Sequence, residues 1–189
     1  DLVEKNLEWF YPQAGNFESL LYQSQLLQAD AIQFAIEAHR AAKPRCMGTL
    51  YWQLNDCWPS ATWSGIDYYG NWKALHYRLR TAFQTFLPMV VIEKDKPKIR
   101  IISDHPEETA GELEITLISF EGEVLSKEKR SIRIPENGNV LLESFKEPET
   151  VAMERRNDVL LMLEFRKGDR TIARNHHFFD KPAHLRLRK

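Results

Sequence analysis

The sequence is 189 residues long, 43% hydrophobic and 28% charged, with a formal net charge of −1. These values are close to the globular average and exclude a disordered, fibrous or collagen-like chain. Because 26 Lys and Arg are balanced by 27 Asp and Glu, nucleic acid is not expected as a partner. No apolar run approaches the roughly 20 residues of a membrane span, and residues 1–9 do not resemble a signal peptide. We therefore expect no membrane partner, and the compartment stays open.

Aromatic and charged residues are distributed unevenly along the chain. All five Trp residues lie within the first 72 positions, and residues 1–89 carry seven Lys or Arg and eight Asp or Glu. Residues 90–189 carry 19 of each charge sign and no Trp. This change of composition predicts two domains, residues 1–88 and 89–189, which join near Pro88.

The first strong pattern is that of a long amphipathic helix. Asn16 is a suitable N-cap, and Glu18 in the first turn is favourable at the positive end of the helix dipole. From Phe17 to Ala38, apolar or small residues recur with a period near 3.6, which indicates one buried face. Pro44 is expected to end the helix after about seven turns.

Residues 46–54 form an uncharged, largely apolar run, which predicts a buried parallel strand. A polar and aromatic cluster follows at 55–63, then a turn at 67–71 and a second helix at 72–86, closed by Pro88. Helix, strand, loop and helix make up the unit of an α/β fold, whose functional loop follows the strand. In the alternative, a small α+β domain, strand 46–54 joins a sheet of the second half.

From about Lys98 the hydrophobic period changes to two, the period of strands with one wet face. We predict strands at 98–103, 112–120, 123–134, 140–146, 158–166 and 170–179, with hairpin-type turns at 121–122, 137–138 and 167–169. This spacing is typical of an immunoglobulin-like β-sandwich, although the Cys, Trp and Cys of antibody domains are lacking. The fold class is therefore α/β plus all-β.

Several Trp, Asn, Asp and Tyr residues are closely spaced where strand 46–54 ends, which is typical of a sugar-binding rim. Trp faces stack on pyranose rings, and amides and carboxylates bind hydroxyl groups. The competing interpretation is structural: Trp58, Trp63 and Trp72 are favoured as core residues, and Asp56 and Asp67 are candidates for turns or caps.

Other chemistries find no support in the sequence. The adjacent His176 and His177 point to opposite faces of a strand and cannot chelate one ion together, so we expect no metal and no cofactor. Cys46 and Cys57 are too far apart along an extended strand for a disulfide. Glycoside hydrolysis by the usual route needs two carboxylates, and Asp56 is the only carboxylate in the predicted functional loop.

Five tracts of the chain nevertheless resemble a known family. GTLYWQLNDCWP at 48–59 and WSGIDYYGNWKALHY at 63–77 resemble the end of the catalytic barrel in β-mannosidases of glycoside hydrolase family 2. YQSQLLQADAI at 22–32 is similar to the helix entering the last barrel strand of that family. NHHFF at 175–179 and KPAHL at 181–185 are similar to the close of its following sandwich domain. The resemblance spans nearly the whole chain.

The resemblance implies a hydrolase that removes terminal, non-reducing β-D-mannose with retention of configuration, using a glutamate acid/base and a glutamate nucleophile. Its substrate, and so its partner, is a mannose-containing oligosaccharide or glycan. Both family glutamates lie on earlier barrel strands, so we expect this chain to hold no catalytic residue. It then forms the end of a (β/α)8 barrel plus a sandwich, is inactive alone, and self-associates through its exposed barrel face.

Within the family resemblance, Trp52 is the first candidate for substrate binding. Its counterparts lie against the sugar in the catalytic subsite and are often followed by a cis peptide, so we expect the Trp52–Gln53 bond to be cis. Asn55 and Asp56 are the next candidates, either as hydroxyl ligands or as loop anchors.

Two alternatives to a β-mannosidase remain. An exo-β-glucosaminidase, which has a related strand tip, is expected to carry a hydrophobic residue at Gln53 and Asn at Asp56. The second alternative is a non-catalytic module, whose sandwich binds carbohydrate or braces the barrel. Residues 90–189 contain five Phe but no Trp or Tyr, and this lack of an aromatic platform favours bracing.

Overall fold

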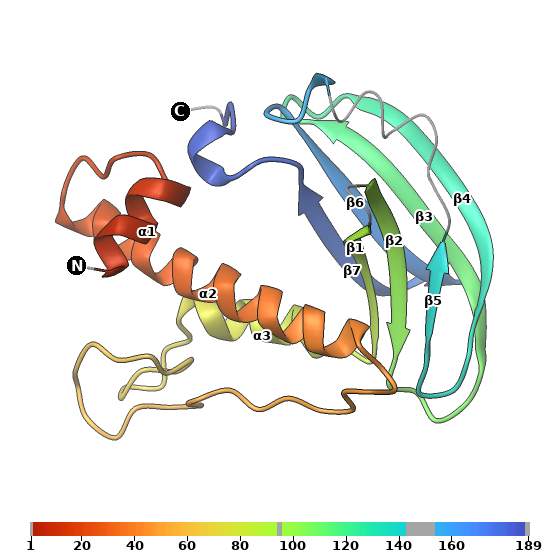
Figure 1. The fold of residues 1–189 in the computed structure, drawn as a ribbon, viewed down its shortest axis with the longest axis horizontal. Coiled ribbons are helices and arrows are strands. Elements are labelled where there is room, and N and C mark those ends of the chain that lie inside the picture. The colour runs from red at the N-terminus through yellow and green to blue at the C-terminus, as the bar shows by residue number, and fades with distance from the viewer. Residues whose placement is uncertain (1, 94–95, 143–153, 188–189) are drawn as a thin grey trace. The chain divides into compact units, whose positions relative to one another are not determined.

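The computed structural model describes residues 2–93, 96–142 and 154–187. The chain divides into two compact units, Asp1–Phe83 and Gln84–Lys189 (Figure 1). The first unit is helical with a long loop, and the second consists of strands followed by one short 3-10 helix. Among the described residues, no helix is long and apolar enough to cross a membrane.

The long helix of the first unit forms as its sequence signals predict. It is α2, Phe17–Ala41, and it follows a shorter helix, α1, Leu2–Phe10, which the sequence analysis did not predict. Asn16 caps α2: its Oδ1 accepts a hydrogen bond of 2.8 Å from the backbone N–H of Ser19. The cap and the end of α2 three residues before Pro44 confirm the prediction.

The second helix is shorter than predicted. It is α3, Ala74–Ala82, and it contacts α2 through a small buried cluster: Ala29, Ile36, Leu75, Leu79 and Ala82. The predicted continuation to Phe86 is wrong, because Phe86 begins strand β1 and its ring contacts the buried Phe165 ring at a centroid distance of 5.1 Å. Pro88 does not end a helix but lies within β1, an edge strand that tolerates the missing N–H group.

The predicted strand at 46–54 is also wrong. These residues belong to no sheet and have no regular secondary structure, and Leu50 is 98% exposed. Joining the sheet of the second half, the alternative, does not occur either. A parallel strand needs a neighbouring strand on which to form its hydrogen bonds, and the described residues form no sheet beside this segment.

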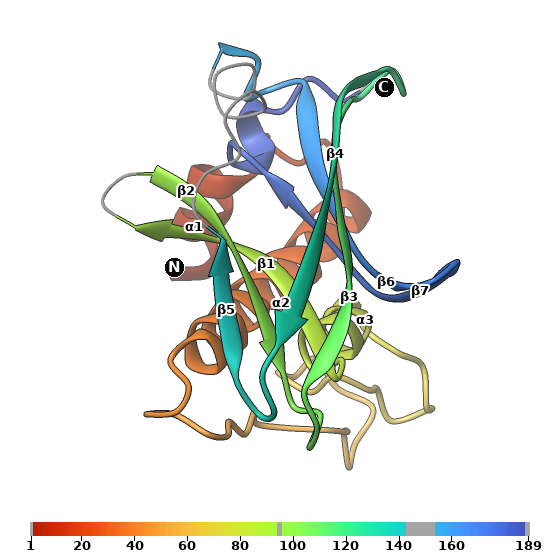
Figure 2. The ribbon, with the colours of Figure 1, turned by 90° about the vertical axis from the view of Figure 1, so that its right-hand side faces the viewer.

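The second unit contains two antiparallel sheets (Figure 2). One has the order β1-β2-β5 and the other β4-β3-β6-β7. The strands are β1 Phe86–Glu93, β2 Lys96–Ser103, β3 Thr109–Ser119, β4 Val124–Ile134, β5 Asn139–Leu142, β6 Val159–Lys167 and β7 Arg170–Phe178; the 3-10 helix is Pro182–His184. All six predicted strands are present, although 143–146 of the fourth lies outside the described residues, and β1 was missed.

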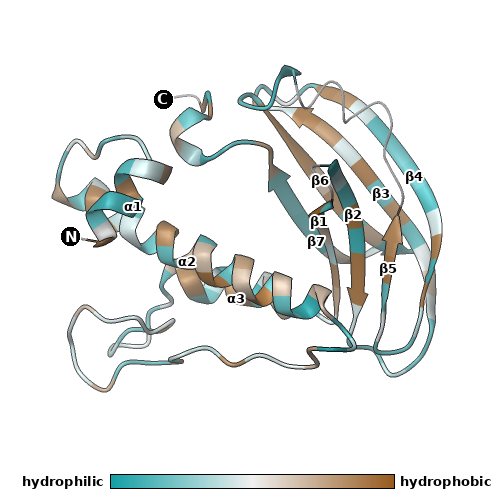
Figure 3. Ribbon diagram, viewed as in Figure 1, coloured by the Kyte–Doolittle hydropathy of each residue, from teal (hydrophilic) through white to brown (hydrophobic). Residues whose placement is uncertain are grey.

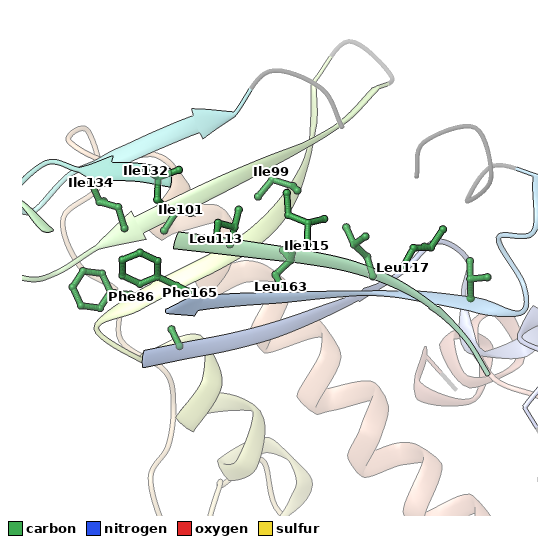
Figure 4. Packing of buried hydrophobic residues seen from close by; sticks show 13 residues of the cluster. Phe86, Ile99, Ile101, Leu113, Ile115, Leu117, Ile132, Ile134, Leu163 and Phe165 are labelled. Carbon is green, nitrogen blue, oxygen red and sulfur yellow. The ribbon is translucent and has the colours of Figure 1, made fainter. Parts of the chain in front are cut away.

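Alternation of apolar and polar residues builds the core of this unit, as the banding of β3 shows in Figure 3. Leu113, Ile115 and Leu117 of β3 are completely buried. They form one cluster with Ile99 and Ile101 of the other sheet (Figure 4). The two sheets thus enclose a common apolar core, which makes this unit a β-sandwich.

The turns follow the predicted punctuation with one difference. Gly122 and Gly168 have φ values of +90° and +58°, which favour glycine, in the β3–β4 and β6–β7 hairpins. The turn containing Asn137, whose φ is +42°, instead connects β4 to β5 in the other sheet, so it is not a hairpin.

Candidate functional site

Trp52 lies in the irregular segment that follows Cys46, with 75% of its surface exposed. The preceding Tyr51 turns inward against the α2–α3 cluster. The Trp52–Gln53 peptide bond is cis, which confirms the expectation drawn from the family resemblance. The segment thus anchors one aromatic side chain and presents the next to solvent.

The residues after Trp52 are held by a short ladder of backbone hydrogen bonds. Gly65 N–H donates to the Gln53 carbonyl at 3.0 Å, and Ile66 N–H donates to the Leu54 carbonyl at 2.9 Å. Asp56 N–H in turn donates to the Ile66 carbonyl at 3.0 Å. The two ends of the loop 53–66 therefore run side by side as a closed structure.

Asp56 lies inside this loop and is only 5% exposed. One carboxylate oxygen accepts a hydrogen bond from the Thr62 hydroxyl, and the other pairs with Lys73 Nζ at 2.9 Å. Lys73 Nζ also donates to the Ser64 hydroxyl at 2.8 Å. These hydrogen bonds, from Thr62 first and Lys73 second, hold the pKa of Asp56 below its usual value.

The neighbouring Asn55 is exposed, and its side-chain Nδ2 donates to the backbone carbonyl of Asp56 at 3.2 Å. Gln53 is half-buried and donates from Nε2 to the Asn55 carbonyl at 3.1 Å. The three predicted site residues therefore differ in placement. Trp52 and Asn55 are on the outside of the loop, and Asp56 is within it.

The other aromatic residues of this region are more exposed than the favoured core interpretation predicts. Trp58, Trp63 and Trp72 have 74%, 58% and 44% of their surface exposed. Helical spacing alone suggested burial for Trp72, but that residue precedes α3 and has its ring edge against His76 instead. The core prediction for these three side chains is wrong in this structure.

Asp67 is a turn residue, as one of the two interpretations proposed. Its Oδ1 accepts a hydrogen bond from the backbone N–H of Asn71 at 2.8 Å, and its Oδ2 accepts one from the Asn71 amide at 2.9 Å. Both bonds stabilise the carboxylate and lower the pKa of Asp67. This carboxylate is therefore committed to the 67–71 turn.

Lys73 is the functional candidate that the sequence analysis missed. The predicted second helix, 72–86, includes Lys73, and a lysine in a helix is ordinarily a solvated surface residue. Two signals were available: Lys73 lies in the tract 63–77 that resembles the family, and it directly precedes α3, where a side chain can reach back to the preceding loop.

No group of three or more metal-ligating side chains occurs within the described ranges.

Comparison with known proteins gives these features a context. The family described as "Mannosidase Ig/CBM-like domain" matches residues 95–184. A β-mannosidase of Capra hircus is 39% identical over 101 residues, and β-mannosidase A of Neosartorya fischeri is 31% identical over 131 residues. These alignments cover 50% and 64% of this chain but only 12% and 14% of the relatives.

Solved structures extend the similarity to both units. The crystal structure of the β-D-mannosidase from Dictyoglomus thermophilum is 27% identical, with a TM-score of 0.85, over 98% of this chain and 22% of that one. The exo-chitosanase of Amycolatopsis orientalis has a TM-score of 0.72 over 92% of this chain and 21% of its own, but at 16% identity it shows the fold alone.

The sandwich unit is thus similar to the mannosidase Ig/CBM-like domain over residues 95–184. The chain as a whole is similar to the C-terminal portion of β-mannosidases of glycoside hydrolase family 2, which confirms the resemblance seen in residues 22–77 and 175–185.

Proposed function

We propose that this chain is the C-terminal portion of a retaining exo-β-mannosidase that hydrolyses terminal, non-reducing β-D-mannose residues. In this proposal, residues 1–88 complete a (β/α)8 barrel and contribute to its sugar subsite. Residues 89–189 form an immunoglobulin-like sandwich that braces the barrel.

The observation that carries the proposal is the extent of similarity to the D. thermophilum β-D-mannosidase, which includes 98% of this chain and therefore both units. The match is not limited to the sandwich, which a non-catalytic module would share. It includes the segment with Trp52, where the residues suited to binding a sugar are concentrated.

Trp52 is the proposed stacking platform of the subsite. An exposed indole face suits the apolar face of a pyranose, and the exposed amide of the nearby Asn55 suits its hydroxyl groups. For Asp56 the anchor role is favoured over the ligand role, because both of its carboxylate oxygens already accept hydrogen bonds inside the loop.

The acid/base and nucleophile glutamates are expected from barrel strands that precede these residues in the relatives. Large apolar side chains of the first unit are exposed, among them Phe17 at 76% and Phe34 at 75%. Such a surface suits packing against further barrel elements.

The test is hydrolysis of p-nitrophenyl β-D-mannopyranoside by the full-length protein, with p-nitrophenyl β-D-glucosaminide as the competing substrate. We expect a preference for the mannoside, and Trp52→Ala should lower kcat/KM at least about tenfold, equivalent to about 1.4 kcal/mol of transition-state binding. Trp9→Ala is the matched control, since Trp9 is 65% exposed on α1, outside the 48–77 tract.

Preference for the glucosaminide would instead support an exo-β-glucosaminidase, against the expectation from Gln53 and Asp56. The 189-residue chain alone should turn over neither substrate. Turnover by the purified chain that is abolished by Trp52→Ala, which excludes a contaminating enzyme, would contradict the proposed division of the active site.

A further inference from the structure

Lys73 contacts both ends of the loop 53–66 from its position at the start of α3. Its backbone N–H donates to the Gly65 carbonyl at 2.9 Å. Its Nζ reaches the Asp56 carboxylate at 2.9 Å and the Ser64 hydroxyl at 2.8 Å. One residue therefore fixes the beginning of the loop through Asp56 and its end through Ser64 and Gly65.

The ion pair between Lys73 and Asp56 is buried, so its loss should destabilise the loop 53–66. The side chains of Asp56 and Lys73 are 1% and 15% exposed, so water cannot readily replace the ammonium group as a partner of the carboxylate. Without Lys73 Nζ, the Asp56 carboxylate stays buried with only neutral side-chain donors, the hydroxyl groups of Thr62 and Ser64. A buried carboxylate that loses its cation favours an opened loop in which water reaches it.

The exposed Trp52 and Asn55 lie directly beside the ends of the loop 53–66 that Lys73 holds. Trp52 precedes the laddered residue Gln53, and Asn55 adjoins Asp56 and bridges to Ile66. We infer that Lys73 is a positioning residue for the sugar subsite: it holds Asp56 and the ends of the loop so that Trp52 and Asn55 have fixed places. The inference rests on the proposed function, because it assigns this role within the proposed β-mannosidase site.

The first experiment is Lys73→Met in the full-length protein, assayed on p-nitrophenyl β-D-mannopyranoside. We expect kcat/KM to fall about 10- to 100-fold, mostly through kcat, as a misplaced subsite lowers the rate of the reacting complex. Lys129→Met is the matched control: Lys129 pairs with Glu112 at 2.8 Å on the sandwich, and 53% of its side chain is exposed. The control should retain its full kcat/KM.

Chemical rescue separates positioning from folding. Lys73→Cys treated with 2-bromoethylamine acquires a thioether side chain that ends in an ammonium group, close to lysine in length. We expect this treatment to restore most of kcat/KM, relative to wild-type protein treated in parallel. Failure of the ammonium to restore activity in a folded, aminoethylated variant would overturn the inference.

A second measurement does not depend on activity. Hydrogen exchange of the amides of Asp56, Gly65 and Ile66, which form the ladder, should accelerate at least tenfold in Lys73→Met, with α2 unchanged. Unchanged exchange at these amides would overturn the inference. If wild-type protein does not cleave the mannoside, the proposed function fails, while the exchange result still decides whether Lys73 fixes the loop.

Ser64→Ala serves if Lys73→Met does not fold. It removes the contact of Lys73 Nζ with the Ser64 hydroxyl, together with the hydrogen bond of 2.9 Å that this hydroxyl donates to the Ile66 carbonyl, and it leaves the Asp56 ion pair in place. A smaller rise in exchange at the same amides is expected. An unchanged exchange rate in Ser64→Ala, with Lys73→Met unable to fold, would assign Lys73 to general stability and overturn the inference.

Discussion

Gly111 provides a sharp test of packing in the sandwich. Gly111 of β3 has no room for a side chain: a Cβ atom there would lie 2.5 Å and 2.7 Å from ring atoms of Phe165 and 2.6 Å from the Arg166 carbonyl oxygen. Gly111→Ala should therefore destabilise the sandwich, although alanine has a higher strand propensity than glycine.

The magnitude follows from which atoms can move. Carbon atoms normally approach to about 3.5–4.0 Å, so either the ring or the strand must shift by about 1 Å. The Phe165 ring is fully buried against Phe86, and the Arg166 oxygen belongs to the backbone of β6, so neither can move freely. Overpacking of this kind costs about 1–3 kcal/mol.

Hydrogen exchange followed by mass spectrometry is the suitable assay, since it reads β3 and β6 separately from the first unit. A loss of about 2 kcal/mol should speed exchange of their protected amides about 30-fold. Phe165→Leu replaces the ring with a smaller side chain. The loss of stability caused by Gly111→Ala should therefore be smaller in that background than in the wild type. Gly48→Ala is the control, because no heavy atom lies within 4 Å of its added Cβ.

Equal protection of β3 and β6 in wild type and Gly111→Ala would refute the packing argument. An equal cost in both backgrounds would show that the Phe165 ring is not responsible for the clash.

Three further predictions concern pH, a helix cap and association. Burial lowers the pKa of His177 from 6.5 to about 4. Between these two pH values His177 is therefore protonated in the unfolded chain and neutral in the folded chain. The free energy of unfolding should fall by about 1–3 kcal/mol from pH 7 to pH 4, as urea titrations would show, and His177→Phe should flatten this dependence. Asn16→Ala removes the cap of α2 and should cost about 1 kcal/mol, seen as faster exchange in its first turn; unchanged exchange would contradict the cap's role. Because Leu50 and Phe34 are exposed, the 189-residue chain should self-associate; sedimentation velocity giving a 22.2 kDa monomer at all concentrations would contradict this.

Local signals in the sequence predicted the parts of the fold that depend on neighbours along the chain. The Asn16 cap and Pro44 mark α2 correctly, because a helix closes its hydrogen bonds within itself. The alternation in β3 and the glycine turns beside it identified the sandwich, because a strand with one buried face has an unambiguous period.

The errors concern residues whose structure depends on distant partners. Residues 46–54 have the composition of a buried strand but have no neighbouring strand among the described residues. Phe86 continues the helical spacing of α3, yet pairing with Ser103 in the sheet and burial against Phe165 decide its place. Hydrophobic periodicity indicates which residues are buried, but not the element against which they pack.

The role of Trp52, Asn55 and Asp56 in substrate binding stays a prediction, drawn from the resemblance that covers their tract. Their placement is what the structure adds: Trp52 and Asn55 are exposed, and Asp56 is buried. The environment of Asp56 could not be predicted, since Thr62 and Lys73 approach it from 6 and 17 positions away. Only the closed loop brings these three side chains together.

The burial of Asp56 beside the exposed Trp52 and Asn55 has an evolutionary consequence. Asp56, which holds the loop, is buried, whereas Trp52 and Asn55, which the proposed function assigns to the sugar, are exposed on the same short stretch of backbone. Substitutions on the outer side can therefore alter ligand preference without unfolding the loop, whereas inner substitutions are tolerated only as matched changes. If the proposed function holds, the same loop can serve enzymes of different specificity.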